Sequence, residues 1–180
     1  MLSRPAAYDV VLLSGTVGAG KTTTAAALSD LERTEGRRHA VVDLDQVRLL
    51  QPAPSGDPFA HEVELANLRD LARNYRAAGA ERLVLAGVVE DAREVPRYVA
   101  ALCGSRLLLC RLTVDLEVVR ARLQARHHDD AAALAWHLER TVELTAILDA
   151  DPFEDVRINT TDRSPQSVAH DVRRAAGWEA

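Results

Sequence analysis

The sequence has few of the features that mark secreted or membrane proteins. It contains two cysteines, Cys103 and Cys110, and neither has the partners that a disulfide framework or a metal site requires. No apolar run approaches the ~20 residues of a membrane-spanning helix. Residues 1–5 lead within about ten residues into a strand-like run, which leaves no room for a signal peptide. We therefore expect a cytoplasmic protein with no membrane partner.

The sequence also lacks an excess of positive charge. Its formal net charge is -5, which argues against a broad surface for nucleic acids or anionic membranes, although a local basic pocket is compatible with it. Two motifs of GTPases, N-K-x-D and D-x-x-G, are missing at the expected places, which disfavours a GTPase. With 180 residues, 47% hydrophobic and 27% charged, the chain has the composition of a soluble globular protein and the length of one domain with a sizeable core.

A glycine-rich motif is the most informative feature that the sequence does have. Residues 15–22 read G-x-x-x-x-G-K-T, with an apolar, β-branched run before them and an alanine- and leucine-rich segment after them. This order predicts the strand, phosphate-binding loop and helix of P-loop nucleotide-binding proteins. The glycines let backbone N–H groups converge on phosphates, and the start of the helix adds its positive dipole end. The residues expected to bind ATP are Gly15, Val17, Gly18, Ala19, Gly20, Lys21, Thr22 and Thr23.

Two residues of this motif have expected chemical roles. Lys21 is predicted to be catalytic, because it would reach the β- and γ-phosphates and stabilise their charge. The hydroxyl group of Thr22 is predicted to ligate Mg²⁺. ATP and Mg²⁺ are therefore the expected cofactors.

Strand-like and helical segments alternate along the rest of the chain. The runs predicted as buried parallel strands are Val10–Ser14, Ala40–Leu44, Leu83–Val89, Leu107–Leu112 and Val156–Asn159. The segments predicted as helices are Thr22–Glu35, Pro58–Ala78, Asp91–Leu102, Asp115–Ala125, Ala131–Leu148 and one that begins at Ser164 and Pro165. The alternation predicts an α/β fold in which residues 1–180 form a single domain, a P-loop NTPase-type three-layer sandwich around a five-stranded parallel sheet.

Two local features complete this outline. Residues 51–58 contain three prolines and a glycine and are expected to be irregular. Because they follow the second strand at the carboxyl edge of the sheet, they form either a substrate-side flap or a plain surface connection. Within the predicted helix Ala131–Leu148, the residues expected to share one apolar stripe are Leu134, Leu138, Val142 and Leu148.

A pair of acidic residues closes the second predicted strand. In an extended chain Asp43 and Asp45 point to the same side, because side chains alternate along a strand. Beside a loop that holds ATP and Mg²⁺, one carboxylate can hold metal-bound water and the other can accept the proton of an attacking hydroxyl group. We assign Asp45, which lies farther out, as the general base, and Asp43 to the magnesium shell. The alternative is that both acids merely end the strand and cap the next turn.

The P-loop together with residues 42–48, V-D-L-D-Q-V-R, resembles the small-molecule kinase branch of P-loop proteins. Adenylylsulfate kinases have a closely similar D-G-D-N-[VI]-R stretch at the end of their second strand, and shikimate, gluconate and chloramphenicol kinases have a comparable acidic position. The resemblance implies that Asp45 is the acceptor-side aspartate, that Asp43 is the first acid of the pair, and that Arg48 anchors the substrate. In this chain Leu44 replaces the glycine and Gln46 replaces the asparagine.

The same resemblance predicts a helical lid, at approximately residues 115–149, inserted between the fourth and fifth strands. Arg122 and Arg126 lie four residues apart on one helix face there, and we expect them to act as catalytic lid arginines on the transferred phosphoryl group. Arg140 on the next helix is a further candidate. The alternative for all three is a solvent-exposed charged face.

Two polar segments after strands have expected places near the ligands. Glu90 follows the third strand and is expected to bind the substrate as a polar wall of the acceptor pocket, or to position a water molecule. Thr160 and Thr161 follow the fifth strand. They either contact the adenine through backbone groups, as the resemblance implies, or only begin the last helix.

These features together predict an ATP-dependent kinase that phosphorylates a hydroxyl group of a small molecule, such as a metabolite, a nucleoside or an antibiotic. One alternative is a nucleotide switch or ATPase that uses ATP without a small acceptor. Another is a kinase that acts on an RNA end, although a net charge of -5 gives no visible basic track for nucleic acid. The sequence leaves the oligomeric state open, and a homodimer is one compatible state.

Overall fold

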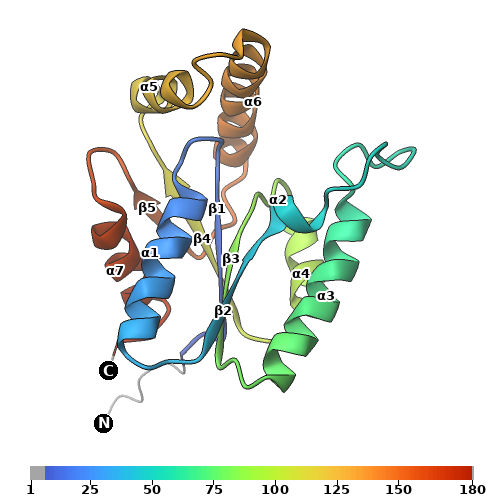
Figure 1. Ribbon diagram of the computed structural model, residues 1–180, viewed down its shortest axis with the longest axis vertical. Coiled ribbons are helices and arrows are strands. Elements are labelled where there is room, and N and C mark those ends of the chain that lie inside the picture. Colours follow the sequence, from blue (N-terminus) through green and yellow to red (C-terminus); the bar gives the residue numbers. More distant parts are fainter. Residues whose placement is uncertain (1–6, 180) are drawn as a thin grey trace.

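The computed structural model describes residues 7–179, which fold around a parallel sheet (Figure 1). Residues 1–5, on which the expectation of no signal peptide rests, lie outside the described residues. The strand order is β2-β3-β1-β4-β5, and every neighbouring pair is parallel, which confirms the predicted sheet. The strands are β1 (Val10–Gly15), β2 (His39–Asp43), β3 (Arg82–Ala86), β4 (Leu107–Thr113) and β5 (Val156–Asn159).

Helices cover both faces of the sheet and its carboxyl edge. The helical elements are α1 (Lys21–Thr34), α2 (Leu44–Val47), α3 (His61–Ala77), the 3₁₀ turn η1 (Ala92–Glu94), α4 (Val95–Ala101), α5 (Leu116–Arg126), α6 (Ala131–Ala150) and α7 (Pro165–Ala175). Figure 1 shows α1 and α7 on one side of the sheet, α3 and α4 on the other, and α5 and α6 above the carboxyl edge. Helices α5 and α6 lie between β4 and β5, and their movement as a lid stays a prediction. Within residues 7–179, no helix has both the length and the apolar character needed to cross a bilayer.

The central strand β1 separates two hydrophobic cores. Val11 and Leu13 pack into one core with α1 and α7, whereas Val10 and Leu12 pack into the other with α3 and α4. All four side chains are fully buried. The continuous apolar run at the start of the sequence is therefore explained by a strand that is covered on both faces.

The inward face of α6 differs from the predicted apolar stripe. Thr141, Leu144 and Leu148 are buried, whereas Val142 is 55% exposed, so the prediction that Val142 shares the buried stripe is wrong. Thr141 is accommodated inside because its hydroxyl group donates a hydrogen bond to the backbone oxygen of His137 at 2.8 Å.

Several element boundaries also differ from the predictions. Strand β2 ends at Asp43 instead of Leu44, and β3 ends at Ala86 instead of Val89. Helix α3 begins at His61 instead of Pro58, because the Asp57 carboxylate accepts hydrogen bonds from the backbone N–H groups of His61 and Glu62 at 2.8 and 3.0 Å. The segment 51–58 has no helix or strand, as predicted.

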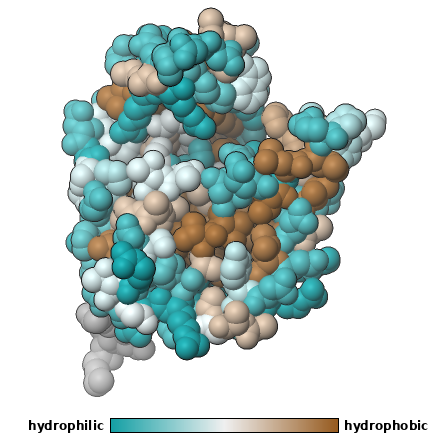
Figure 2. All heavy atoms as spheres, in the orientation of Figure 1, coloured by the Kyte–Doolittle hydropathy of each residue, from teal (hydrophilic) through white to brown (hydrophobic). Residues whose placement is uncertain are grey.

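Hydrophobic side chains gather on the face of the molecule that carries β2, α2 and α3 (Figure 2). Val41 on the edge strand is 38% exposed, and Leu49 and Leu50, directly after α2, are also exposed. Apolar side chains beside a sheet edge favour association with another protein surface. This face is therefore a candidate for an interface with another protein surface, and the oligomeric state stays a prediction to be tested.

A close contact joins the loop after β3 to α2. A Cβ atom at Gly87 would lie 2.5 Å from Cδ1 and 2.8 Å from Cβ of Leu44. Leu44 is fully buried and stands between Asp43 and Asp45, where the chain turns from β2 into α2. The missing side chain at Gly87 therefore helps to fix the point at which the two acidic residues leave the sheet.

We predict that Gly87→Ala lowers the free energy of unfolding by about 1–3 kcal/mol, the usual cost of inserting carbon atoms into a packed site. Chemical denaturation followed by circular dichroism measures this change. A double-mutant cycle with Leu44→Ala supplies the control. This substitution keeps Cβ but removes Cδ1 and Cγ, which lie 2.5 and 3.0 Å from the added methyl group, and should therefore reduce its cost. An equal cost in both backgrounds would contradict the contact.

Candidate functional site

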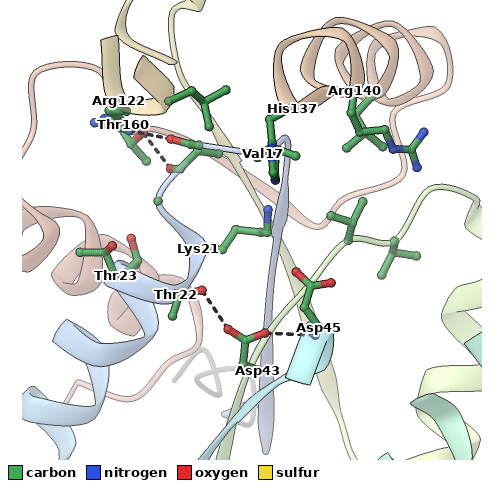
Figure 3. Close-up of a pocket in the computed structure, with 18 of the residues that line it drawn as sticks. Val17, Lys21, Thr22, Thr23, Asp43, Asp45, Arg122, His137, Arg140 and Thr160 are labelled. Atoms are coloured by element: carbon green, nitrogen blue, oxygen red, sulfur yellow. Dashed lines mark hydrogen bonds between the residues drawn. The ribbon is translucent and has the colours of Figure 1, made fainter. Parts of the chain in front are cut away.

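A cleft of about 920 Å³ opens at the carboxyl edge of the sheet (Figure 3). One side, here called the P-loop side, consists of residues 17–24 with Arg122, Arg126, Thr160 and Arg163. The opposite side, here called the α3 side, comes from α2, the start of α3, the loop after β3, the η1–α4 segment and α6. The α3 side is lined by Asp45, Arg48, Phe59, His61, Val88, Glu90, Glu94, Tyr98, Trp136 and Arg140.

The P-loop is held tightly between β1 and α1. Gly15 has a φ of 136°, and a Cβ atom there would lie 2.4 Å from the backbone oxygen of Leu112, so only glycine fits. Gly20 has a φ of 92° and forms the left-handed N-cap of α1. Because the first N–H groups of a helix have no intrahelical acceptors, the start of α1 offers donors to an anion in the cleft.

Lys21 lies at the base of the cleft, on the side of the P-loop that faces Asp43 and Asp45 (Figure 3). Its Nζ donates hydrogen bonds to the backbone oxygens of Gly15 and Thr16, both at 2.9 Å. Burial lowers the pKa of Lys21 from 10.5 to about 8, against the opposing effect of the charges of Asp45 and Asp43. An ammonium group that is this poorly solvated gains more than an exposed one from a nearby anion.

Asp43 and Asp45 lie together in the cleft, but the predicted reason for this is wrong. The chain turns into α2 at Leu44, so the alternation of side chains along a strand does not apply to Asp45. Asp43 accepts a hydrogen bond from the hydroxyl group of Thr22 at 3.1 Å and another from the backbone N–H of Asp45 at 3.0 Å. Asp43 therefore caps α2, as the alternative held, and also faces the P-loop.

Thr22 and Asp43 present oxygen atoms that fit Mg²⁺. This ion takes octahedral oxygen ligands at about 2.1 Å, which places neighbouring ligands about 3 Å apart. Thr22 Oγ1 and Asp43 Oδ2 are 3.1 Å apart. Across residues 7–179, no cluster of three or more His, Cys, Asp or Glu side chains is arranged to hold a metal ion. The pair therefore suits an ion whose remaining ligands are water and phosphate oxygens.

Asp45 is oriented by a chain of charged groups. Arg48 forms an ion pair with Asp45 and another with Glu64 of α3, at 3.2 Å. The Glu64 side chain is 1% exposed and also accepts a hydrogen bond from the hydroxyl group of Tyr98. Burial raises the pKa of Glu64, and the hydrogen bond from Tyr98 and the charge of Arg48 oppose this rise. Asp45 itself is half exposed, so its carboxylate is both held and open to the cleft.

Helix α5 packs directly on the P-loop. Arg122 Nη1 donates a hydrogen bond to the backbone oxygen of Gly18 at 3.0 Å. Val119 is close enough that a Cβ atom at Gly18 would lie 3.1 Å from its Cγ1. Arg126 lines the same side of the cleft, and its charge helps to lower the pKa of Lys21. The two predicted lid arginines therefore face the phosphate-binding loop.

Arg140 and Glu90 meet on the α3 side. They form an ion pair, and Arg140 forms a second ion pair with Glu143 at 2.6 Å. The Arg140 guanidinium also lies over the ring of Phe59, 5.1 Å from its centroid. These contacts connect α6 to the loop after β3 and to the segment before α3.

The turn after β5 is tied to the P-loop and to α5. Thr160 Oγ1 lies within hydrogen-bond distance, 3.2 Å, of the backbone oxygens of Ala19 and Thr113, and Thr160 lines the P-loop side. Thr161 Oγ1 accepts a hydrogen bond from the backbone N–H of Asp115 at 2.9 Å. A contact of this turn with adenine stays a prediction.

The predicted site residues line the cleft except for Gly15, beneath the loop, and Thr161, in the turn after β5. The sequence analysis missed the group behind Asp45, which comprises His61, Glu64, Glu94 and Tyr98. His61 Nε2 lies 2.6 Å from the Glu94 carboxylate. The spacing of His61 and Glu64, one helical turn apart, is a local signal that could have found this pair. No local signal connects either residue to Glu94 or Tyr98, which lie more than one element away in the sequence.

Comparisons with known proteins agree with this fold. The model of a family described as AAA domain matches residues 11–141, a range that includes the P-loop, both acidic residues and the arginines of α5 and α6. No curated protein matches the sequence significantly.

Three solved structures are similar over nearly their whole length. The Deinococcus radiodurans tunicamycin resistance protein is 24% identical, with a TM-score of 0.64 over 94% of this chain and 96% of that one. The Mycobacterium tuberculosis APS kinase CysC, in complex with AMPPNP and APS, is 21% identical, with a TM-score of 0.63 over 96% and 99%. The Acinetobacter baumannii shikimate kinase, in complex with shikimate, is 17% identical, with a TM-score of 0.63 over 93% and 92%. The chain therefore belongs to the AAA domain family and has the fold of P-loop small-molecule kinases.

Proposed function

We propose that the protein is an ATP-dependent kinase that transfers the γ-phosphoryl group to a hydroxyl group of a small molecule. The observation that carries this proposal is the cleft, in which a P-loop with its lysine faces an oriented and open carboxylate, Asp45. The similarity to kinases solved in complex with APS and with shikimate supports the same class of reaction.

The P-loop side is suited to hold a triphosphate. Backbone N–H groups of residues 17–23 would bind the phosphates, and Lys21 would exchange its bonds to the loop for β- and γ-phosphate oxygens. Thr22 and Asp43 would hold Mg²⁺, which neutralises phosphate charge when it is bound. Arg122 and Arg126 would place positive charge beside the transferred group.

The α3 side is suited to hold the acceptor. Asp45 accepts the proton of the acceptor hydroxyl group while that oxygen forms its bond to the γ-phosphorus. The bond between this phosphorus and the β–γ bridging oxygen breaks in the same step, and ADP leaves with the electron pair. Arg48 keeps the Asp45 carboxylate in place, and Glu90 forms part of the wall around the acceptor.

The direct test of this function incubates the protein with ATP, Mg²⁺ and a panel of hydroxyl compounds, and detects products by mass spectrometry. The panel spans sugars, nucleosides, amino alcohols and antibiotics. We expect a product heavier by one phosphoryl group, formed together with ADP and absent with Lys21→Ala. Tight ATP binding without stimulation by any acceptor would contradict the proposal and favour a nucleotide switch or a macromolecular acceptor such as an RNA end.

We predict that Asp45→Asn lowers the turnover of the acceptor by ~10²-fold or more, because the amide cannot accept the hydroxyl proton. ATP binding should be nearly unchanged, since in the described part of the chain the hydrogen bonds of Asp45 go to Asp43 and Arg48 and not to the P-loop. Steady-state kinetics at saturating acceptor and calorimetric titration with ATP separate the two effects. Asp30→Asn, which removes an exposed carboxylate of α1, serves as the matched control. Near-normal turnover of Asp45→Asn would show that Asp45 is not the base.

We predict that ATP binding weakens as the pH rises above about 8, the pKa of Lys21 in the free protein. Phosphate charge raises this pKa in the complex, so binding takes up a proton once free Lys21 begins to deprotonate. Below this pH the lysine is charged in both states and binding should not depend on its titration. Calorimetry with AMPPNP and Mg²⁺ in buffers of different ionisation enthalpy measures both affinity and proton uptake. A dissociation constant that stays constant well above this pH would contradict the prediction, and Lys21→Met should lack the dependence.

A further inference from the structure

The two arginines on the α3 side of the cleft are already neutralised by carboxylates of the protein. Arg48 is paired with Asp45 and Glu64, and Arg140 with Glu90 and Glu143. Figure 3 shows Arg140 on α6, across the cleft from Arg122. A guanidinium group between two carboxylates exerts little net positive field on an approaching ligand. The charges on this side therefore do not form an anion site.

The ion pair between Arg48 and Glu64 is also difficult to exchange. Glu64 is almost completely buried, and its other partners are the hydroxyl group of Tyr98 and, at 3.7 Å, Nδ1 of His61. If an anionic ligand drew Arg48 away, Glu64 would remain as a buried charge without its cation, which is strongly unfavourable. Arg48 therefore keeps its ion pairs with carboxylates of the protein and does not bind a ligand carboxylate, sulfate or phosphate group.

Arg140 is held from two directions. Glu90 binds it from the loop after β3, and Glu143 binds it from its own helix. The ring of Phe59 lies under its guanidinium. The other arginines that line the cleft, Arg122, Arg126 and Arg163, belong to the P-loop side. An anionic acceptor on the α3 side would thus meet Asp45, Glu90 and Glu94. Among the described residues, the arginines that contact these carboxylates are already in ion pairs with them.

We propose that the acceptor is a hydroxyl compound without an anionic group, and that Glu64 and Glu90 set this preference by neutralising Arg48 and Arg140. The inference rests on the proposed kinase function for the nature of the acceptor, although its electrostatic part concerns binding alone. Guanidinium N–H groups that are not used in ion pairs donate to uncharged oxygen atoms of such a ligand. Phe59 and Trp136, both partly exposed at the cleft, contact its apolar part.

The test titrates sulfate into the protein saturated with AMPPNP and Mg²⁺, so that the P-loop is filled, at constant ionic strength in a calorimeter. We expect wild type to show no saturable sulfate site. Glu90→Gln and Glu64→Gln should bind sulfate at least about tenfold more tightly, because each leaves one arginine with a single carboxylate partner and therefore with donors for the anion. Glu62→Gln is the matched control, since Glu62 is 69% exposed and pairs with Arg97 outside the cleft lining. It should behave as wild type.

Sulfate binding by wild type that equals that of Glu90→Gln would overturn the inference, and so would the absence of any gain in both variants. This titration involves no phosphoryl transfer, so its outcome is separate from the success or failure of the kinase proposal. A second measurement compares the phosphorylation of a nucleoside with that of its monophosphate. We expect wild type to prefer the uncharged compound and Glu90→Gln to lose at least part of that preference, whereas a wild-type preference for the monophosphate would contradict the proposal.

Discussion

The register of three neighbouring parallel strands, β2, β3 and β1, is the constraint on which the site depends. Leu13 of β1 lies opposite Ala86 of β3, and Ala86 lies opposite Asp43 of β2. The P-loop, the loop after β3 and α2 therefore leave the sheet at one edge, where the direction of strand order reverses around β1. This register places Asp43 only 3.1 Å from Thr22, although the two residues are separated by 21 positions in the sequence. Gly87 completes the arrangement because it leaves room for Leu44 between the two acidic residues.

The two sides of the cleft differ in whether their cationic side chains are paired with carboxylates. On the P-loop side, Lys21 and Arg126 face the cleft without a carboxylate partner within hydrogen-bond distance in the described part of the chain, and Arg122 contacts a backbone oxygen. On the α3 side, each arginine is bound by two carboxylates. A triphosphate and an uncharged hydroxyl compound are the two kinds of ligand that this division favours. Asp45 stands at the border between the sides, where a proton would be accepted during transfer.

The parts of the site that could be predicted from the sequence are those whose chemistry is local. The glycines and lysine of the P-loop, and the acidic residues after β2, belong to short motifs with a physical reason for their spacing. The sequence correctly predicted that Asp43 and Asp45 lie together, but the predicted reason, alternation along a strand, was wrong. No local rule indicated that α2 starts at Leu44. The ion pair of Arg140 with Glu90 joins residues 50 positions apart, and the bond of Tyr98 to Glu64 spans 34, so neither follows from periodicity. The burial of Val142 was predicted wrongly because Thr141, whose hydroxyl group bonds to the backbone of α6, lies on the face of that helix that turns inward.

A crystal structure of the protein with AMPPNP and Mg²⁺ would show directly whether the cleft is arranged for phosphoryl transfer. We predict that the Lys21 ammonium leaves the backbone oxygens of Gly15 and Thr16 for the terminal phosphates, and that Thr22 and Asp43 lie around the metal. We also predict that the γ-phosphate points toward Asp45 and the α3 side. A γ-phosphate directed away from Asp45, or a nucleotide bound outside the P-loop, would show that the cleft does not work in this way.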